Sequence, residues 1–163
     1  MPIQMVHILV LILCANAIPV LLRKIFIRSW LAHPIDSGFC LNDGHPLLGN
    51  SKTWRGLLGS LFFTPLVGMI LGFSYFDSLL IAILAMFGDL LSSFIKRRMG
   101  LASSRMALFL DQFPESGFPL LYASQVMMLI SLKEVLVGMI LFLLLELVLS
   151  RIFFYMGIRK RPY

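Results

Sequence analysis

Long apolar stretches dominate the pattern of this chain, and five of them are candidates for membrane helices. They cover residues 5–22, 56–76, 78–95, 117–132 and 135–158. About 20 apolar residues cross a bilayer as a helix, with roughly 17 as the lower limit, so the fourth stretch is the shortest candidate. Because lipid cannot satisfy the open edge of a sheet, a helix is the expected form. The pattern predicts an all-α polytopic membrane protein with a single membrane-embedded domain over residues 1–163.

Composition supports this class. Of the 163 residues, 59% are hydrophobic and 13% are charged, whereas about a quarter of a soluble domain is charged. This balance excludes a soluble globular domain, a disordered chain and a coiled coil. The two cysteines, Cys14 and Cys40, are too few for a secreted disulfide scaffold and lack metal-ligand spacing.

The distribution of basic residues predicts the orientation. If the chain crosses five times, 13 of the 14 lysines and arginines lie on one side, in the long loops 23–55 and 96–116 and at the C-terminus; Lys133 is the exception. The positive-inside rule then puts the N-terminus outside and both long loops in the cytoplasm. We therefore expect a protein of the cytoplasmic (inner) membrane with a cytoplasmic working face. Anionic lipid accounts for the net charge of +6, and no nucleic-acid partner is expected.

One acidic residue interrupts the third apolar stretch, in Gly88-Asp89-Leu90-Leu91-Ser92-Ser93-Phe94-Ile95-Lys96-Arg97-Arg98. At about 100° per residue, Ser93 and Lys96 fall on the same helix face as Asp89, and Arg97 lies near it. A carboxylate suits a divalent cation, and the cations suit the phosphates that such an ion bridges. The alternative is an acid paired with a neighbouring helix, with cations that only mark the cytoplasmic boundary.

The first long loop carries a second group of candidates. Lys52, Thr53 and Arg55 put two cations and a hydroxyl near the start of a helix, where free N–H groups favour anions. The alternative is that both cations reach toward the membrane surface beside an interfacial tryptophan, Trp54. Upstream, Asp36 is a candidate for binding a nucleotide or a metal, or for making a turn.

Two further acids complete the set of candidates. Asp111, in the second loop, is placed to meet Asp89 at the membrane surface and share a metal ion with it. Glu146 is a second acid within a membrane segment, and it either lines a lipid entrance or pairs with Arg151.

These pieces together resemble a known family. They are Pro34-Ile35-Asp36, Leu48-Gly49-x-x-Lys52-Thr53-Trp54-Arg55-Gly56, Gly88-Asp89-Leu90-x-x-Ser93-x-x-Lys96-Arg97-Arg98 and Asp111-Gln112. Over nearly its whole length the chain is similar to the CDP-archaeol synthase family, itself similar to the phosphatidate cytidylyltransferases. The resemblance implies a cytidylyltransferase-like domain that transfers CMP from CTP to a membrane lipid phosphate, releases pyrophosphate and depends on Mg²⁺.

The expected roles follow from the chemistry of that reaction. Asp89, Asp111 and Lys96 are the expected catalytic residues, and both aspartates are expected to hold the metal. The expected ligands of CTP and the phosphates are Asp36, Lys52, Thr53, Arg55, Ser93, Lys96 and Arg97.

The chain departs from the family pattern in the second loop. Pro114 stands where the wider group has a second aspartate, and Glu115 is expected to replace that carboxylate as a metal ligand. Residues 106–110 replace a basic stretch that contains tryptophan. The acceptor therefore stays open between an isoprenoid ether lipid and a diacyl lipid.

Two other functions stay open as well. One is a CTP-dependent polyprenol or lipid kinase, and the other is a small membrane transporter or assembly subunit without catalytic activity. Five helices are few to enclose a lipid site, so a homodimer is a further hypothesis.

Overall fold

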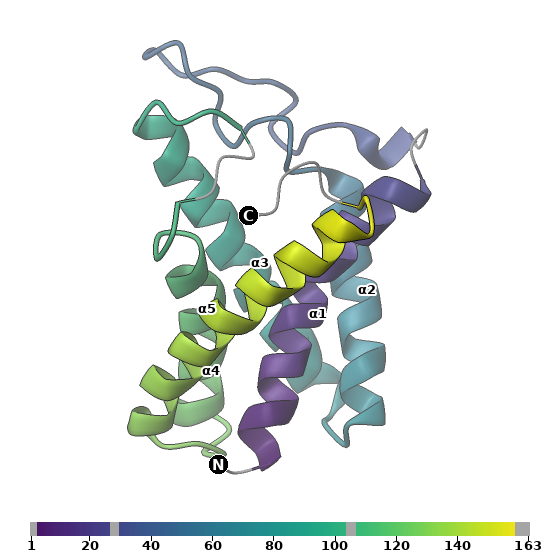
Figure 1. The fold of residues 1–163 in the computed structure, drawn as a ribbon, viewed down its shortest axis with the longest axis vertical. Coiled ribbons are helices and arrows are strands. Elements are labelled where there is room, and N and C mark those ends of the chain that lie inside the picture. The colour runs from purple at the N-terminus through teal and green to yellow at the C-terminus, as the bar shows by residue number, and fades with distance from the viewer. Residues whose placement is uncertain (1–2, 27–29, 104–106, 159–163) are drawn as a thin grey trace.

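The structure of this chain, a computed structural model, describes residues 3–26, 30–103 and 107–158. Within these residues the regular elements are helices, so the predicted all-α class is confirmed. In chain order they are α1 (Ile3–Ile25), the short 3₁₀ helix η1 (Trp30–Ala32), α2 (Trp54–Ile70), α3 (Tyr75–Arg98), α4 (Gln112–Gln125) and α5 (Leu132–Tyr155) (Figure 1).

The bounds of the fourth helix differ from the prediction. The apolar pattern predicts residues 117–132, whereas α4 covers Gln112–Gln125. Its start lies earlier because Pro114 is tolerated in a first helical turn, where its missing N–H would have no partner. Its end lies earlier because Ser131 begins the next helix: its side chain and that of Glu134 form a reciprocal capping box.

Among the described residues, three helices are long and apolar enough to cross a membrane: α1, α3 and α5. Helix α2 is apolar but has 17 residues, and α4 has 14, which correspond to roughly 21 Å of rise. These long apolar helices support an integral membrane protein. Five crossings and an external N-terminus stay predictions.

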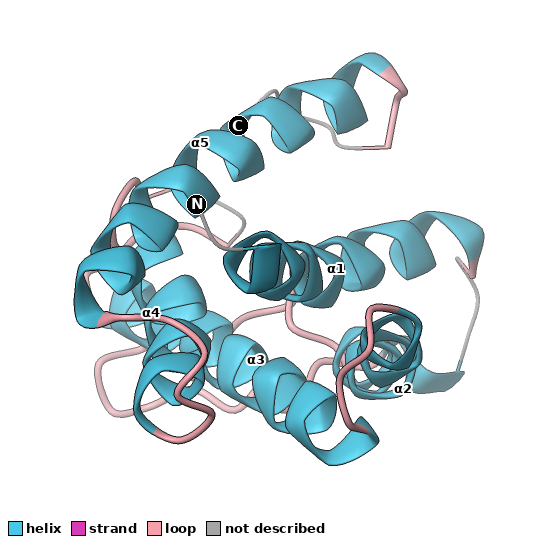
Figure 2. Ribbon diagram, turned by 90° about the horizontal axis from the view of Figure 1, so that it is seen from below, coloured by secondary structure: helices cyan, strands magenta, loops and turns pink. Residues whose placement is uncertain are grey.

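Helix α1 lies at the centre of the bundle, and the other helices surround it (Figure 2). The core combines one face of α1 with apolar side chains of its neighbours. Its fully buried members include Ile8, Leu11, Ile12, Ile81, Leu120 and Phe142. Helix α5 runs obliquely across the bundle (Figure 1).

Helix α4 begins beside the middle of α3 rather than at its end. Gly88 in α3 packs against the backbone of Pro114 and Glu115, and an added Cβ would lie 2.6 Å from the Glu115 nitrogen. Gly88 is ten residues before Arg98, so the segment that follows α3 returns about 15 Å along that helix before α4 starts. This return carries Glu115 to the depth of Asp89 and brings Asp111 to Lys96.

The connections differ at the two ends of the bundle. Residues 71–74 and 126–131 make short turns at one end, whereas residues 30–53 and 99–103 of the two long connections lie at the other (Figure 1). This matches the two-faced arrangement predicted from the sequence. Some of the cations that predicted the orientation lie outside the described residues: Arg28, Arg105, Arg159, Lys160 and Arg161.

Candidate active site

Lys52 and Asp89 form an ion pair that joins the first long loop to α3. The Lys52 ammonium donates to both carboxylate oxygens of Asp89, each at 2.5 Å. Both side chains are about one-fifth exposed. The loop therefore places the Lys52 cation beside Asp89, the acidic residue that the sequence analysis identified in an apolar helix.

A second ion pair joins α3 to the loop before α4. Lys96 Nζ lies 2.6 Å from Asp111 Oδ1, and Lys96 also acts electrostatically on Asp89. The other carboxylate oxygen of Asp111 accepts a hydrogen bond from the Ala107 backbone at 2.9 Å, which holds the returning loop. The expectation that Asp89, Lys96 and Asp111 lie together agrees with this geometry.

Glu115 adds a third carboxylate. It is buried in the first turn of α4, where its side chain interacts with Asp89 and lies close to Lys52. We call these five residues, Lys52, Asp89, Lys96, Asp111 and Glu115, the charged cluster.

The carboxylates of the cluster determine the charge of Lys52. Burial alone would lower the pKa of its ammonium, but Asp89, Glu115 and Asp111 outweigh that effect and hold the pKa above its ordinary value. Lys52 is therefore a permanent cation at neutral pH.

Asp36 organises the loop that carries Lys52. One of its oxygens accepts hydrogen bonds from Leu48 N and Gly49 N, both at 2.8 Å, and the other accepts one from Gly38 N at 3.1 Å. Burial would raise its pKa, but these N–H groups lower it below the ordinary value. The Asp36 carboxylate is thus engaged with the backbone of its own loop.

Arg98 fastens the same loop to the end of α3. Its guanidinium pairs with Asp43, donates to the carbonyl oxygens of Pro46 at 2.7 Å and His45 at 3.2 Å, and lies over the ring of Phe94. The backbone of Ile35 also donates to the carbonyl of Lys52 at 2.9 Å. These bonds hold Lys52 beside Asp89.

The remaining predicted residues lie around the cluster in different ways. Thr53 caps α2, and its hydroxyl accepts from Gly56 N at 3.3 Å. Arg55 is turned toward the end of α1, where it donates to the carbonyl of Phe26. Ser93 is buried in α3, one turn after Asp89. The structure therefore separates Arg55 from the cluster.

Among the described residues, the buried donors without a hydrogen-bond partner include Nε of Arg97 and Nε2 of Gln112, whose residues directly follow Lys96 and Asp111 in the chain. Another nitrogen of Arg97, Nη2, donates to the Ala102 carbonyl at 3.0 Å, and the guanidinium interacts electrostatically with Asp111. A buried donor left unpaired costs about 1–3 kcal/mol, which an anionic ligand would offset.

The oxygen ligands of the cluster suit Mg²⁺, and the Lys52 ammonium already occupies the position of a cation against both oxygens of Asp89. Within residues 3–26, 30–103 and 107–158, no three acidic, histidine or cysteine side chains are grouped closely enough to hold a metal ion alone. Mg²⁺ commonly binds through one or two carboxylates together with substrate phosphates. The cluster fits that manner of binding.

Several features of the site were missed in the sequence. The pairing of Lys52 with Asp89 joins residues 37 positions apart and has no local signal. Gln112 was noted only as part of a motif. The signal for the close approach of α4 was Gly88 directly before Asp89, since glycine permits backbone contact that any other side chain blocks.

Comparison with a solved structure shows which class of protein has this fold. The chain superposes with a TM-score of 0.73 on a protein described as an intramembrane enzyme for archaeal membrane lipid biosynthesis. The two are 27% identical, and the match covers 92% of this chain and 94% of the other. The fold is thus that of an intramembrane enzyme.

Comparison of sequences then defines the family. Residues 2–77 and 73–163 match the CarS-like CDP-archaeol synthase family. The CDP-archaeol synthase of Thermofilum pendens is 30% identical over 91% of this chain and 75% of its own length, and that of Pyrococcus horikoshii is 37% identical over 80% and 82%. The chain belongs to the CDP-archaeol synthase family, as the sequence motifs indicated.

Proposed function

We propose that this chain transfers CMP from CTP to a membrane lipid phosphate, forming a CDP-activated lipid and pyrophosphate. The observation that carries the proposal is the charged cluster, which combines cations for phosphates with carboxylates for a metal inside an apolar bundle. Membership of the family supports the reaction type. The family name favours an isoprenoid ether acceptor, archaeol-like, over a diacyl lipid.

In the proposed reaction, an oxygen of the acceptor phosphate attacks the α-phosphorus of CTP. The new P–O bond forms as the bond to the β-phosphate oxygen breaks, and pyrophosphate leaves with that electron pair. A phosphate monoester is largely ionised at pH 7, so the attack requires no general base. The protein therefore contributes position and charge.

Each member of the cluster has a place in this reaction. Lys52 and Lys96, with Arg97 nearby, bind phosphoryl oxygens and stabilise the charge that develops on pyrophosphate. One or two of the carboxylates of Asp89, Asp111 and Glu115 would hold Mg²⁺ together with the substrate phosphates, and the ion when bound supplies further neutralisation of those phosphates. The Lys52 ammonium has three N–H donors and gives two of them to Asp89, so one is left for a phosphoryl oxygen.

We further propose that the charged cluster opens to the cytoplasm. CTP is a cytoplasmic metabolite, and the loops that carry Lys52 and Asp111 lie at the end of the bundle where the basic residues concentrate. A homodimer stays a prediction.

The position of the transferred label tests the reaction. Purified protein in detergent is incubated with Mg²⁺, with CTP labelled at either the α- or the γ-phosphate, and with a panel of acceptors that contains isoprenoid-ether lipid phosphates, diacyl lipid phosphates and a polyprenol. A cytidylyltransferase puts the α-label into lipid and the γ-label into pyrophosphate. Transfer of the γ-label to a polyprenol would instead establish a lipid kinase, and transfer of neither label would favour a transporter or assembly subunit.

A further inference from the structure

The junction of α1 and α2 carries two arginines that lie outside the charged cluster. Arg23 is exposed in the last turn of α1, and Arg55 belongs to the first turn of α2. The Arg55 guanidinium donates to the carbonyl of Phe26, just beyond the end of α1, and interacts electrostatically with Arg23. Two like charges are therefore held together at one end of this helix pair. We call Arg23 and Arg55 the arginine pair.

Close packing of the two helices fixes this junction. Pro19 has no N–H, so the carbonyl of Ala15 lacks its usual partner within α1, and the Ser60 hydroxyl of α2 donates to it at 2.9 Å. An added Cβ on Gly56 would lie 2.9 Å from the Pro19 side chain. The helices thus meet one residue from Arg55, so its position beside the end of α1 follows from their packing.

The arginine pair has no acidic partner among the described residues. All eight aspartates and glutamates of the chain are described, and none forms an ion pair with Arg23 or Arg55, since the ion pairs involve Lys52, Lys96 and Arg98. Arg55 is only 8% exposed, and its buried Nε has no acceptor in the described part of the chain. A buried cation without a counter-ion is costly, so an anion from outside the chain would stabilise the pair.

An apolar face of α2 leads to the arginine pair from the membrane. Trp54, Leu58 and Phe62 follow at four-residue spacing and are 42%, 45% and 59% exposed, so they form one face at the edge of the bundle (Figure 2). Tryptophan is enriched where lipid headgroups meet hydrocarbon, and Trp54 stands at the end of this face. A lipid that lies along the face would bring its phosphate to the level of Arg55.

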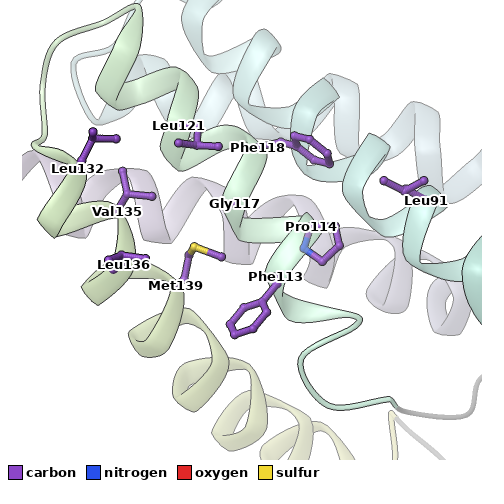
Figure 3. Close-up of a pocket in the computed structure, with 10 residues that line it drawn as sticks. All are labelled: Leu91, Phe113, Pro114, Gly117, Phe118, Leu121, Leu132, Val135, Leu136 and Met139. Carbon is purple, nitrogen blue, oxygen red and sulfur yellow. The ribbon is translucent and has the colours of Figure 1, made fainter.

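This face is separate from the apolar groove of the molecule. The groove lies between α3, α4 and α5, and its lining includes Leu91, Leu121 and Leu136 (Figure 3). All the residues that line it belong to these three helices, whereas the arginine pair and the face beside it belong to α1 and α2. A headgroup at the arginine pair therefore belongs to a lipid outside the groove.

We propose that Arg23 and Arg55 bind the phosphate of an anionic membrane lipid that is not consumed in the reaction. Guanidinium groups suit this ligand, because each can donate two parallel N–H groups to phosphate oxygens. The bound phosphate offsets the repulsion within the arginine pair. It also stabilises the segment that carries Lys52, because Lys52 lies three residues before Arg55 and Thr53 caps α2 between them.

Quenching of tryptophan fluorescence by lipid tests the site without turnover. The chain has two tryptophans, so a Trp30→Phe protein reports on Trp54 alone, next to Arg55. This protein is reconstituted in phosphatidylcholine vesicles that contain increasing fractions of phosphatidylglycerol or phosphatidylcholine with brominated tails. Quenching is expected to show a preference of about tenfold or more for phosphatidylglycerol, because charge-assisted hydrogen bonds to phosphate contribute that much. Equal quenching by the two lipids would overturn the proposal.

Arginine variants of the Trp30→Phe protein provide the matched comparison. Arg23→Gln changes an exposed side chain, so folding is expected to be kept while the preference is lost, and Arg55→Gln is expected to lose it as well. Arg151→Gln removes an exposed cation of α5, the helix whose end contacts Lys24 of α1, and is expected to keep the preference. Equal losses in Arg23→Gln and Arg151→Gln would indicate general attraction to a basic surface and contradict the proposal.

Competition identifies the source of the phosphate. At matched ionic strength, CTP and inorganic phosphate should leave the quenching by brominated phosphatidylglycerol unchanged, whereas unbrominated phosphatidylglycerol should relieve it. Relief by CTP would put the arginine pair in the nucleotide site, and relief by inorganic phosphate would indicate a site for free phosphate. Either result would overturn the assignment to a lipid headgroup. Because no product is measured, failure of CMP transfer would contradict only the proposed function.

Discussion

At the residue scale, the decisive feature is that each lysine of the cluster pairs with an aspartate from a different part of the chain. Lys52 comes from the first loop and meets Asp89 in α3, whereas Lys96 in α3 meets Asp111 in the second loop. The pairing stabilises these charges in an apolar bundle, because unpaired charges there would be costly.

The variant Lys52→Gln tests whether the Lys52 ammonium contributes to nucleotide binding. Loss of the ammonium is expected to raise KM for CTP about tenfold or more, since a charge-assisted contact to phosphate is worth at least ~1.4 kcal/mol. Lys133→Gln, which removes a cation at the opposite end of the bundle, is expected to leave KM unchanged. Equal KM values in the two variants would exclude Lys52 from the nucleotide site.

The Asp36 carboxylate is expected to make the stability of the folded protein depend on pH. Its pKa is lowered in the folded protein, so the ionised carboxylate stabilises the loop at pH values above the unfolded pKa of about 3.9, and this stabilisation is lost as the pH falls through the lower, folded value. Asp36→Asn should thus reduce the melting temperature in detergent at pH 7 and at pH 5, with a smaller difference from wild type below about pH 4. A difference that stays constant down to pH 3 would contradict the assignment.

At the element scale, the contact between α3 and the start of α4 aligns the site. Gly88→Ala puts a methyl group against the backbone of Pro114 and Glu115, which cannot move aside like a flexible side chain. We expect a loss of about 1–3 kcal/mol in stability and a larger loss of activity, because Glu115 is displaced from Asp89. Melting curves and turnover measure the two effects.

Gly117→Ala is the matched control for Gly88→Ala. Its added methyl group meets only the flexible end of Met139, at 3.4 Å, so stability and activity are expected to stay near wild type. Wild-type activity in Gly88→Ala would show that the site does not depend on the close packing of α3 against the start of α4.

The sequence predicted the elements better than their contacts. The 3.6-residue period placed Asp89 and Lys96 on one face of α3, and the structure agrees. The apolar pattern could not locate the start of α4, because Glu115 looks like a loop residue until its partners are known. The capping box at Ser131 and Glu134 was a local signal that would have corrected the start of α5.

The pairing of Lys52 with Asp89 and the role of Asp36 could not have been predicted. Both depend on how a loop without regular structure folds back on itself, and hydrogen bonds from Leu48 N and Gly49 N to Asp36 decide that path. A lone aspartate before a turn has the same appearance in a sequence whether it binds a ligand or backbone.

At the scale of the whole molecule, the orientation in the membrane can be tested with a native cysteine. Cys40 is exposed on the long connection 26–53, while Cys14 is half-buried in α1. If that connection is cytoplasmic, a membrane-impermeant maleimide should label inverted vesicles and not intact cells, and Cys40→Ser should abolish the labelling. Labelling of intact cells would put the charged cluster on the outer face.

The central claim is that the charged cluster in the middle of the bundle catalyses CMP transfer to lipid. The most direct measurement compares transfer of α-labelled phosphate from CTP to a lipid phosphate by wild type, Asp89→Asn and Asp77→Asn. Asp77 is an acid of the same helix at the opposite end, bound to Ser74 and Tyr122. We predict a loss of about 100-fold or more in Asp89→Asn and near wild-type transfer in Asp77→Asn. Transfer at the wild-type rate by a folded Asp89→Asn protein would contradict the account.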